Sequence, residues 1–209
     1  MLSLRFSSKS YILKYMTIWF ASGNHHKKKE LSDILSPYSI NIKIPSEAGI
    51  EFNPEESGTS FLENAMIKAK ALYDLVGEPV IADDSGLCVD ALEGRPGIHS
   101  AYYGGEGLSS IERNALVLSE LGDNPNRGAC FVCAMVLYYA PNRFFIAQEP
   151  LFGNIVKDME SARGSGGFGY DPILYISEYK RTVAELTEEE KNRISHRGRA
   201  GIAIGRLLG

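Results

Sequence analysis

Two adjacent aspartates near the middle of the chain constrain its fold more than any other feature. Asp83 and Asp84 follow the apolar residues Pro79-Val80-Ile81 and precede Ser85-Gly86, so the pattern predicts a buried strand that ends in a glycine turn. Because side chains alternate along a strand, the two carboxylates cannot both face the core. We expect one to anchor the turn and the other to project into a cleft suited to a metal ion and phosphate. A turn with solvated carboxylates would explain the motif equally well if it stood alone.

The composition of the chain argues against several classes of protein. Its 209 residues, 44% hydrophobic and 23% charged, predict a soluble globular protein with a full core. The net charge of -4 provides no polybasic face, which disfavours binding of duplex nucleic acid. Apolar runs such as residues 134–140 are far shorter than the ~20 residues that a membrane-spanning helix needs. A single nucleotide remains compatible with all of these features.

Three cysteines, Cys88, Cys130 and Cys133, have no secretory leader before them and favour a reducing, cytoplasmic location. Cys130 and Cys133 form a C-x-x-C motif, which is typical of metal and redox sites. The motif lies inside a strongly β-like segment over residues 129–139, where positions three apart face opposite sides of the strand. We therefore expect buried core thiols instead of a metal or redox pair.

Residues 1–15 are basic, rich in serine and free of acidic residues, as in a transit peptide, but they lack a small-residue cleavage site. Met16 begins a convincing first strand. We therefore expect residues 1–15 to be an N-terminal extension with little function, and residues 16–209 to form a single domain with two lobes.

The periodicity of the remaining chain alternates between strands and helices and predicts an α/β (mixed α+β) fold. Strands are expected over residues 16–22, 39–44, 79–83, 87–92, 129–139, 143–149 and 153–156, with a hairpin between 129–139 and 143–149. Helices are expected from Gly23-Asn24 to about Leu35 and over residues 109–121. Another should run from the capping box Ser60-Phe61-Leu62-Glu63 to about Val76. Two more are expected after a second capping box at Thr187 and from residues 195–199 to Leu208. A long acidic loop over residues 45–58 has the length of a functional loop.

Lys68 occupies an unusual place on the helix expected after Ser60. Residues at 100° intervals put its side chain within the apolar stripe of Phe61, Ala65, Leu72 and Val76. An ammonium group in such a stripe needs an anionic partner, because burial of an unpaired charge is costly. We favour this functional interpretation over a lysine that extends its stem to reach solvent.

Two expected helix starts offer hydrogen-bond donors to a ligand. Residues 22–27 connect a strand to a helix, which is a common phosphate site. His196 and Arg197 also lie where a helix is expected to begin. For these two residues a solvated basic patch is an equally good interpretation.

A glycine-rich segment contains a formal G-x-G-x-x-G from Gly164 to Gly169. A dinucleotide-binding fingerprint must open a helix, whereas Tyr170-Asp171-Pro172 predicts an extended chain. We therefore expect a flexible loop that presents Phe168 and Asp171. The chain also lacks a P-loop and a G-x-S-x-G motif, which excludes the usual NTPase and serine hydrolase classes.

The candidate functional features fall in five segments, namely residues 22–27, Glu56 with residues 60–68, residues 82–86 with 94–97, residues 166–171, and residues 195–199. Their order and spacing over about residues 16–208 resemble the inosine triphosphate pyrophosphatase family, also called Ham1-like or non-canonical purine NTP pyrophosphatases. The resemblance implies a long, twisted mixed sheet with flanking helices, two lobes around a nucleotide-binding cleft, and a homodimer. It also implies hydrolysis of ITP, dITP or XTP to the nucleoside monophosphate and pyrophosphate, which removes deaminated purines from the nucleotide pool.

The resemblance and the charge of the substrate together suggest how the phosphates would be held. A triphosphate carries about four negative charges, so it requires Mg²⁺ and cationic side chains, and Lys27 and Lys68 are the candidates. By family match, Glu56 and Asp84 would bind the Mg²⁺, while Asp84 would alternatively orient or deprotonate the attacking water. Further substrate-binding candidates are Ser22, Gly23, Asn24, His25, His26 and Ser85.

Base recognition is expected to depend on Phe168, which would stack on the purine. The other side would be lined by Gly169, Tyr170, Asp171, Lys191, His196 and Arg197. Hypoxanthine and xanthine present an acceptor at position 6, where adenine presents a donor. Donors from Lys191, His196 or Arg197 would therefore be left unpaired over adenine, at a cost of roughly 1–3 kcal/mol per group.

Two positions depart from the family pattern. Tyr102 stands where a basic, phosphate-binding residue is common, and His99 stands where tyrosine is frequent. Arg95 is a candidate to supply the missing cation.

Two alternative functions also fit the sequence. A Maf-type nucleotide pyrophosphatase would act on modified pyrimidine nucleotides with a similar two-lobed fold, and a non-catalytic nucleotide sensor would use the same cleft. The combination of Lys68, Asp84 and Glu56 argues against the sensor.

Overall fold

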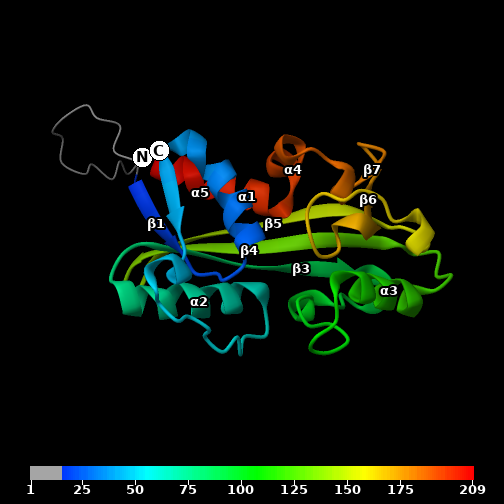
Figure 1. Cartoon of the computed structure of the whole chain (residues 1–209), viewed down its shortest axis with the longest axis horizontal. Coiled ribbons are helices and arrows are strands. Elements are labelled where there is room, and N and C mark those ends of the chain that lie inside the picture. The colour runs from blue at the N-terminus through cyan, green and yellow to red at the C-terminus, as the bar shows by residue number, and fades with distance from the viewer. Residues whose placement is uncertain (1–15) are drawn as a thin grey trace.

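The computed structural model describes residues 16–209, and the N-terminal extension expected over residues 1–15 lies outside them. Its centre is a seven-stranded sheet with the strand order β2-β1-β3-β4-β5-β6-β7 (Figure 1). The strands are β1 (Met16–Phe20), β2 (Ile40–Lys43), β3 (Val80–Val89), β4 (Gly128–Ala140), β5 (Arg143–Ile155), β6 (Leu174–Ile176) and β7 (Arg181–Thr182). β1 is parallel to β2 and β3 and the other pairs are antiparallel, so the sheet is mixed, as predicted.

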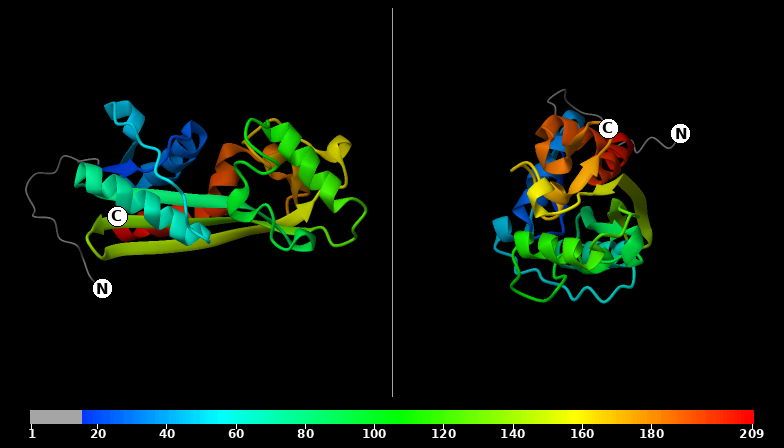
Figure 2. Two further views of the ribbon diagram at one scale, coloured as in Figure 1. Left: turned by 90° about the horizontal axis from the view of Figure 1, so that it is seen from below. Right: turned by 90° about the vertical axis from the view of Figure 1, so that its right-hand side faces the viewer.

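Helices lie on both sides of the three long strands β3, β4 and β5 (Figures 1 and 2). In the view of Figure 1, α2 (Phe61–Val76) and α3 (Ser110–Leu121) lie below these strands. α1 (His25–Leu35), α4 (Glu188–Ile194) and α5 (His196–Leu208) lie above them. None of the helices described in residues 16–209 is long and apolar enough to span a bilayer. That these residues form one two-lobed domain stays a prediction.

The core consists of three apolar clusters along the sheet. One cluster packs α1 and α5 onto Ile81, Met135 and Leu137, and a second packs α2 onto Val80, Ala82 and Val136. Odd and even positions of β3 and β4 thus serve opposite faces, as strand geometry requires. The third cluster joins α3 to the far ends of the long strands and to β6.

The acidic pair does not end a strand, which corrects the prediction of two strands over residues 79–83 and 87–92. β3 runs unbroken from Val80 to Val89, and each of its residues, Asp83 and Asp84 included, pairs with a residue of β4. Gly86 is not a turn residue here. A Cβ at this position would lie 2.3 Å from the Gly97 carbonyl oxygen and 2.4 Å from the Ser100 hydroxyl oxygen, so the glycine lets that loop pack against the strand.

A second correction concerns the strands expected over residues 143–149 and 153–156, which are parts of the single strand β5. Pro150 lies inside β5 opposite Val132. Its carbonyl oxygen accepts a hydrogen bond of 3.2 Å from Arg199 Nη1 and therefore points away from β4. A proline is tolerated because its missing N–H also faces that outer side, where no ladder bond to β4 is lost.

The expectation of buried core thiols in the C-x-x-C motif holds for Cys133 and not for Cys130, although the two face opposite sides of the strand as predicted. Cys133 is fully buried in the cluster under α1 and α5, whereas Cys130 is half-buried on the opposite face of β4. All three cysteines are free thiols. Within residues 16–209, no group of three or more histidine, cysteine or acidic side chains is arranged to hold a metal ion.

Candidate active site

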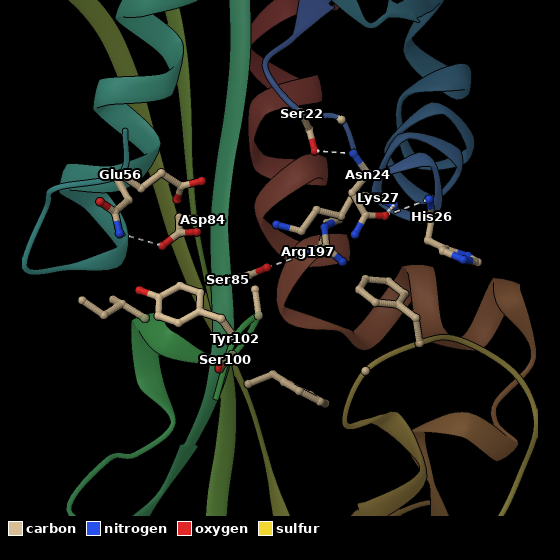
Figure 3. Close-up of a pocket in the computed structure, with 18 of the residues that line it drawn as sticks. Ser22, Asn24, His26, Lys27, Glu56, Asp84, Ser85, Ser100, Tyr102 and Arg197 are labelled. Atoms are coloured by element: carbon tan, nitrogen blue, oxygen red, sulfur yellow. Dashed lines mark hydrogen bonds between the residues drawn. The ribbon is translucent and has the colours of Figure 1, made fainter. Parts of the chain in front are cut away.

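A cavity of about 800 Å³ is lined by the turn before α1, by α2, β3 and α3, and by the segment around Phe168, and it is large enough for a nucleotide (Figure 3). All the predicted site residues except His25 line it. They are Ser22, Gly23, Asn24, His26, Lys27, Glu56, Lys68, Asp84, Ser85, Phe168, Gly169, Tyr170, Asp171, Lys191, His196 and Arg197. His25 is an exposed residue at the start of α1 and does not face the cavity.

The turn from β1 to α1 forms one wall of the cavity. Asn24 caps α1, and its side-chain oxygen accepts hydrogen bonds from the backbone N–H groups of His26 (2.9 Å) and Lys27 (3.1 Å). The Ser22 hydroxyl oxygen accepts one from the N–H of Asn24 at 3.1 Å. These side-chain oxygens occupy positions that phosphate oxygens take at other helix N-termini, because the first N–H groups of a helix lack partners within it.

Lys68 has the anionic partners that its place in the apolar stripe of α2 requires. Its Nζ donates to Glu56 Oε2 at 2.9 Å and to Asp84 Oδ1 at 3.1 Å, and only 10% of its side chain is exposed. Burial disfavours the ammonium ion, but the carboxylates around it have the larger combined effect and raise the pKa of Lys68. The lysine is therefore charged, and it connects α2, β3 and the acidic loop.

Asp84 lies on the α2 side of β3, where it also accepts a 3.4 Å hydrogen bond from Asn64 Nδ2. Burial raises the pKa of Asp84 although Lys68 acts in the opposite direction. A carboxylate with a raised pKa is a better proton acceptor than an ordinary surface aspartate.

Glu56 and Asp84 are the residues of the cavity that could hold Mg²⁺. Glu56 and Asp84 share one ammonium group, so their carboxylates converge closely enough to share a cation. Both offer hard oxygen donors, which Mg²⁺ prefers, and Mg²⁺ commonly uses one or two protein carboxylates with waters and substrate phosphates.

Asp83 points to the other side of β3 and is completely buried there. It accepts hydrogen bonds from Arg197 Nε (3.1 Å) and Nη2 (3.0 Å) and pairs with Lys27 at 3.2 Å. Burial alone would raise its pKa, but Lys27 and Arg197 hold the pKa of Asp83 well below its usual range. As expected, the two aspartates face opposite sides, and each has cationic partners of its own.

Arg197 lines the cavity and also binds several other side chains of the protein. Besides Asp83, its guanidinium donates to Glu30 Oε2 (2.6 Å) and to the Ser85 hydroxyl (2.8 Å). Most of its donors are thus engaged by the protein, and its side chain is 2% exposed. This network fixes Ser85 and the start of α5 against β3.

Phe168 lines the cavity beside His26, at the start of α1. Its ring stacks on His26 with centroids 5.5 Å apart, and Lys191 Nζ and the Arg197 guanidinium lie 5.1 and 5.6 Å from its centroid. Lys191 pairs with Asp171 at 2.7 Å and Glu30 at 2.6 Å. An electron-rich ring placed among cations is suited to stack on a purine.

The chain after Gly169 corrects one expectation and confirms another. Asp171–Ile173 forms a single 3₁₀ turn before β6 and is not extended as predicted, because the N–H of Asp171 bonds to the Phe168 carbonyl. The Asp171 carboxylate in turn accepts from the N–H of Phe168 at 2.8 Å, which closes the loop. No α-helix follows, so the glycine pattern does not form a dinucleotide-binding motif.

His196 is buried and neutral. Its ring stacks on Phe131 at 4.9 Å, and its Nδ1 has no hydrogen-bond partner among the described residues. Burial and the charge of Arg197 lower the pKa of His196 well below its usual value. It can therefore offer a nitrogen atom to a ligand, but not a positive charge.

The departures from the family pattern have distinct surroundings. Tyr102 lines the cavity, half exposed, with its hydroxyl 2.8 Å from His99 Nδ1. Arg95 lies outside the cavity and is bound to Glu120 (2.6 Å) and to the Tyr103 hydroxyl (2.8 Å). The prediction that Arg95 replaces the missing cation is therefore wrong.

Three residues of the site were not anticipated from the sequence. Glu30 neutralises both Lys191 and Arg197, and Asn64 joins Asp84 to the backbone N–H of Gly58. Arg113, on the first turns of α3, lines the cavity. The sequence signal for Asn64 was its place one turn before Lys68, whereas Glu30 and Arg113 resemble ordinary surface residues of amphipathic helices.

Comparison with known proteins gives a consistent result. A sequence model described as the Ham1 family matches residues 18–204. The chain is 53% identical over 196 residues to a dITP/XTP pyrophosphatase from Treponema denticola, covering 92% of this chain and 98% of the relative. It is 44% identical over 184 residues to the Leptospira biflexa protein of the same name, covering 88% and 92%.

Solved structures resemble this fold at similar coverage. The Staphylococcus aureus Ham1 protein superimposes with a TM-score of 0.81 at 36% identity, covering 92% of this chain and 97% of that chain. A HAM1 protein from Coxiella burnetii superimposes with a TM-score of 0.83 at 38% identity, covering 92% and 98%.

Proposed function

Because the chain belongs to the Ham1 family, we propose that it hydrolyses non-canonical purine nucleoside triphosphates, namely ITP, dITP and XTP, to the nucleoside monophosphate and pyrophosphate. The observation that carries this proposal is the cluster of Lys68, Asp84 and Glu56 in the same cavity as Phe168. One end can bind and activate a polyphosphate, and the other can stack a purine. No feature of residues 16–209 favours the pyrimidine-specific or sensor alternatives.

The residues at the phosphate end provide charge and a base. Lys68 is charged, and it is positioned to stabilise negative charge that develops on the departing pyrophosphate. Lys27 and those N–H groups of residues 22–27 that Ser22, Asn24 and Phe20 do not already engage provide further donors to the phosphate tail. Asp84 is the candidate that orients the attacking water or accepts its proton, with Lys68 and Asn64 fixing its two oxygens.

We further propose that the enzyme depends on Mg²⁺, with Glu56 and Asp84 as its protein ligands. When bound, the ion supplies Lewis-acid stabilisation of phosphate charge. Asp84 would then share its oxygens between the ion and water, and Lys68 would remain the protein's own positive charge on the tail.

At the base end, selection depends on donors that meet the purine oxygen at position 6. Lys191 is held by Asp171 and Glu30, and most donors of Arg197 are engaged by carboxylates and Ser85. The ammonium group of Lys191 and the guanidinium of Arg197 nevertheless lie close to the Phe168 ring. Adenine would set its own donor against this positive environment, at a cost of roughly 1–3 kcal/mol per unpaired group.

A substrate panel with product identification tests the proposed function. We expect Mg²⁺-dependent turnover of ITP, dITP and XTP with pyrophosphate as the released product, and kcat/KM for ATP lower by at least about tenfold. Chelation of the metal should abolish turnover. Release of orthophosphate would contradict the assigned bond, and a preference for dUTP or methylated pyrimidine triphosphates would favour a Maf-type enzyme. A wild-type protein that binds ITP without any turnover would favour the sensor.

We also propose that the protein is a homodimer. Three large apolar side chains of β5, Phe144, Ile146 and Phe152, are 42%, 45% and 70% exposed. All are at even positions and therefore share one face of the strand, where a second copy would cover them. The cytoplasmic location expected from the sequence stays a prediction.

The dimer proposal predicts that Ile146→Asp lowers the molar mass measured by light scattering from that of two chains to that of one. The reason is that a charge in an apolar interface is costly to desolvate. Lys157→Asp, outside this apolar row, is the control and should remain dimeric. A wild-type protein that is monomeric at micromolar concentration would contradict the proposal.

A further inference from the structure

The side chain of Arg113 has no hydrogen-bond partner within the described part of the chain. Its guanidinium forms no ion pair there, and its Nε is buried without a hydrogen-bond partner. Only two other side-chain atoms in residues 16–209 are buried and unpartnered, Asn114 Oδ1 and His196 Nδ1. Since a buried, unsatisfied donor costs free energy, an unpartnered Nε next to a cavity indicates that a ligand completes the bonding of this guanidinium.

The other cations of the cavity are already neutralised. Lys27 is paired with Asp83, and Lys68 is paired with Glu56 and Asp84. Lys191 and Arg197 share Glu30 and are also paired with Asp171 and Asp83, respectively. Among the lining residues that the structure describes, Arg113 is therefore the one lysine or arginine that forms no salt bridge with a carboxylate. An unpaired cation attracts a polyphosphate more strongly than the paired ones do, because the charges of the paired cations are already partly compensated.

The neighbours of Arg113 explain why its charge stays free. The adjacent carboxylate of Glu112 is turned back onto Ser109, where it accepts from the backbone N–H and the hydroxyl, both at 2.7 Å, and caps α3. Asn114 Nδ2 donates to the Gly169 carbonyl at 3.2 Å and fixes this turn of α3 against the loop that carries Phe168. The helix start is thus held rigidly while the arginine side chain faces the cavity.

Arg113 and residues 100–102 line the same cavity. The Tyr170 hydroxyl donates to the Ser100 carbonyl at 2.9 Å. Burial raises the pKa of Tyr170 to about 12, and the nearby positive charge of Arg113 opposes that rise. Tyr102 brings no charge to this cavity, and Arg95 does not line it.

We propose that Arg113 binds the phosphate tail of the nucleotide and is a substrate-binding residue of this site. The assignment rests on the proposed function for the identity of the ligand, whereas the unpaired guanidinium is independent of it. A guanidinium is suited to this task because its planar, forked donors match two phosphate oxygens.

The test compares Arg113→Gln with the wild type in two measurements. Loss of a charged hydrogen bond should raise the KM for ITP by roughly tenfold to a hundredfold. In calorimetric titrations with Mg²⁺ present, binding of inorganic pyrophosphate, of inosine monophosphate, or of both should weaken by a similar factor, while binding of inosine stays unchanged. Arg113→Lys keeps the charge without the fork and should recover part of the loss.

Arg95→Gln is the matched control, because it removes an arginine that is bound to Glu120 outside the cavity. It should leave KM and all three affinities unchanged.

Equal weakening of inosine binding in Arg113→Gln would place the contact on the base or ribose and overturn the proposal. So would unchanged binding of all three probes, with or without a lower melting temperature. A wild type that releases no pyrophosphate from ITP or XTP would refute the proposed function alone, since the pyrophosphate titration still tests Arg113.

Discussion

Replacing Lys68 with alanine is expected to lower kcat for ITP and XTP by roughly two to three orders of magnitude, the loss typical of removing one preorganised donor from a site of charge development. Lys68 is the cation in contact with both candidate metal ligands, and it is charged and held in place by them. Steady-state kinetics with pyrophosphate detection measures the effect. KM should change less than kcat if the lysine acts mainly on the departing group.

The control for this prediction is Lys70→Ala, which removes an exposed lysine from the same helix. It should retain wild-type kcat. Thermal unfolding of both variants separates chemistry from folding, because Lys68→Ala leaves Asp84 and Glu56 facing each other without their shared cation. A large loss of stability with unchanged specific activity would make Lys68 a structural residue and would contradict its catalytic assignment.

Asp83→Asn is expected to lower the free energy of unfolding by about 3–5 kcal/mol, because it removes one partner of a buried ionic network. Arg197 would keep its charge in the core with Glu30 as its remaining carboxylate, and Lys27 would lose its partner. Urea denaturation measures the change. Asp74→Asn, at an exposed position of α2, is the control and should alter stability by less than about 0.5 kcal/mol.

The same network gives this effect a pH dependence of definite sign. The folded-state pKa of Asp83 is far below its value in the unfolded chain. Its stabilising contribution is therefore complete above the ordinary aspartate pKa of about 3.9 and is lost progressively as the pH falls toward the folded-state value. The stability difference between wild type and Asp83→Asn should be constant from about pH 6 to pH 8 and should shrink below about pH 4. A difference that grows on acidification would rule out this account.

Local signals in the sequence were sufficient for the helix starts. The hydroxyl of Ser60 accepts from the N–H of Glu63 as a capping box requires, although Glu63 reaches back to Thr59 and not to Ser60. Thr187 forms its box in full, and Ser195 caps α5. Helix ends depend on hydrogen bonds between residues three or four apart, which are visible in the sequence.

The errors in the strands have a common cause. Gly86 and Pro150 read locally as breaks, but each is accommodated by a neighbour distant in sequence, the loop at Gly97 and Ser100 for the first and Arg199 for the second. Whether a glycine ends a strand or admits a close contact depends on what packs against it. That information is absent from a window of ten residues.

The candidate site was predictable where the residues themselves limit their environment. Lys68 on an apolar stripe required an anion, and Glu56 and Asp84 are its partners. The roles of Glu30 and Arg113 were not predictable, because they depend on contacts across the fold. Glu30 is 167 positions from Arg197 along the chain, and Arg113 is distinguished only by lacking such contacts.

The continuous pairing of β3 with β4 limits the insertions and deletions that the sequence of β3 can tolerate. Asp83 and Asp84 are paired with Met135 and Ala134, and each serves a different face of the sheet. Insertion or deletion of one codon upstream in this strand would exchange the faces of both aspartates. The candidate catalytic carboxylate of Asp84 would then be buried under α1 and α5, and the structural carboxylate of Asp83 would lie on the α2 side. Length variation among relatives should therefore be confined to loops such as residues 94–107, while β3 accepts only substitution.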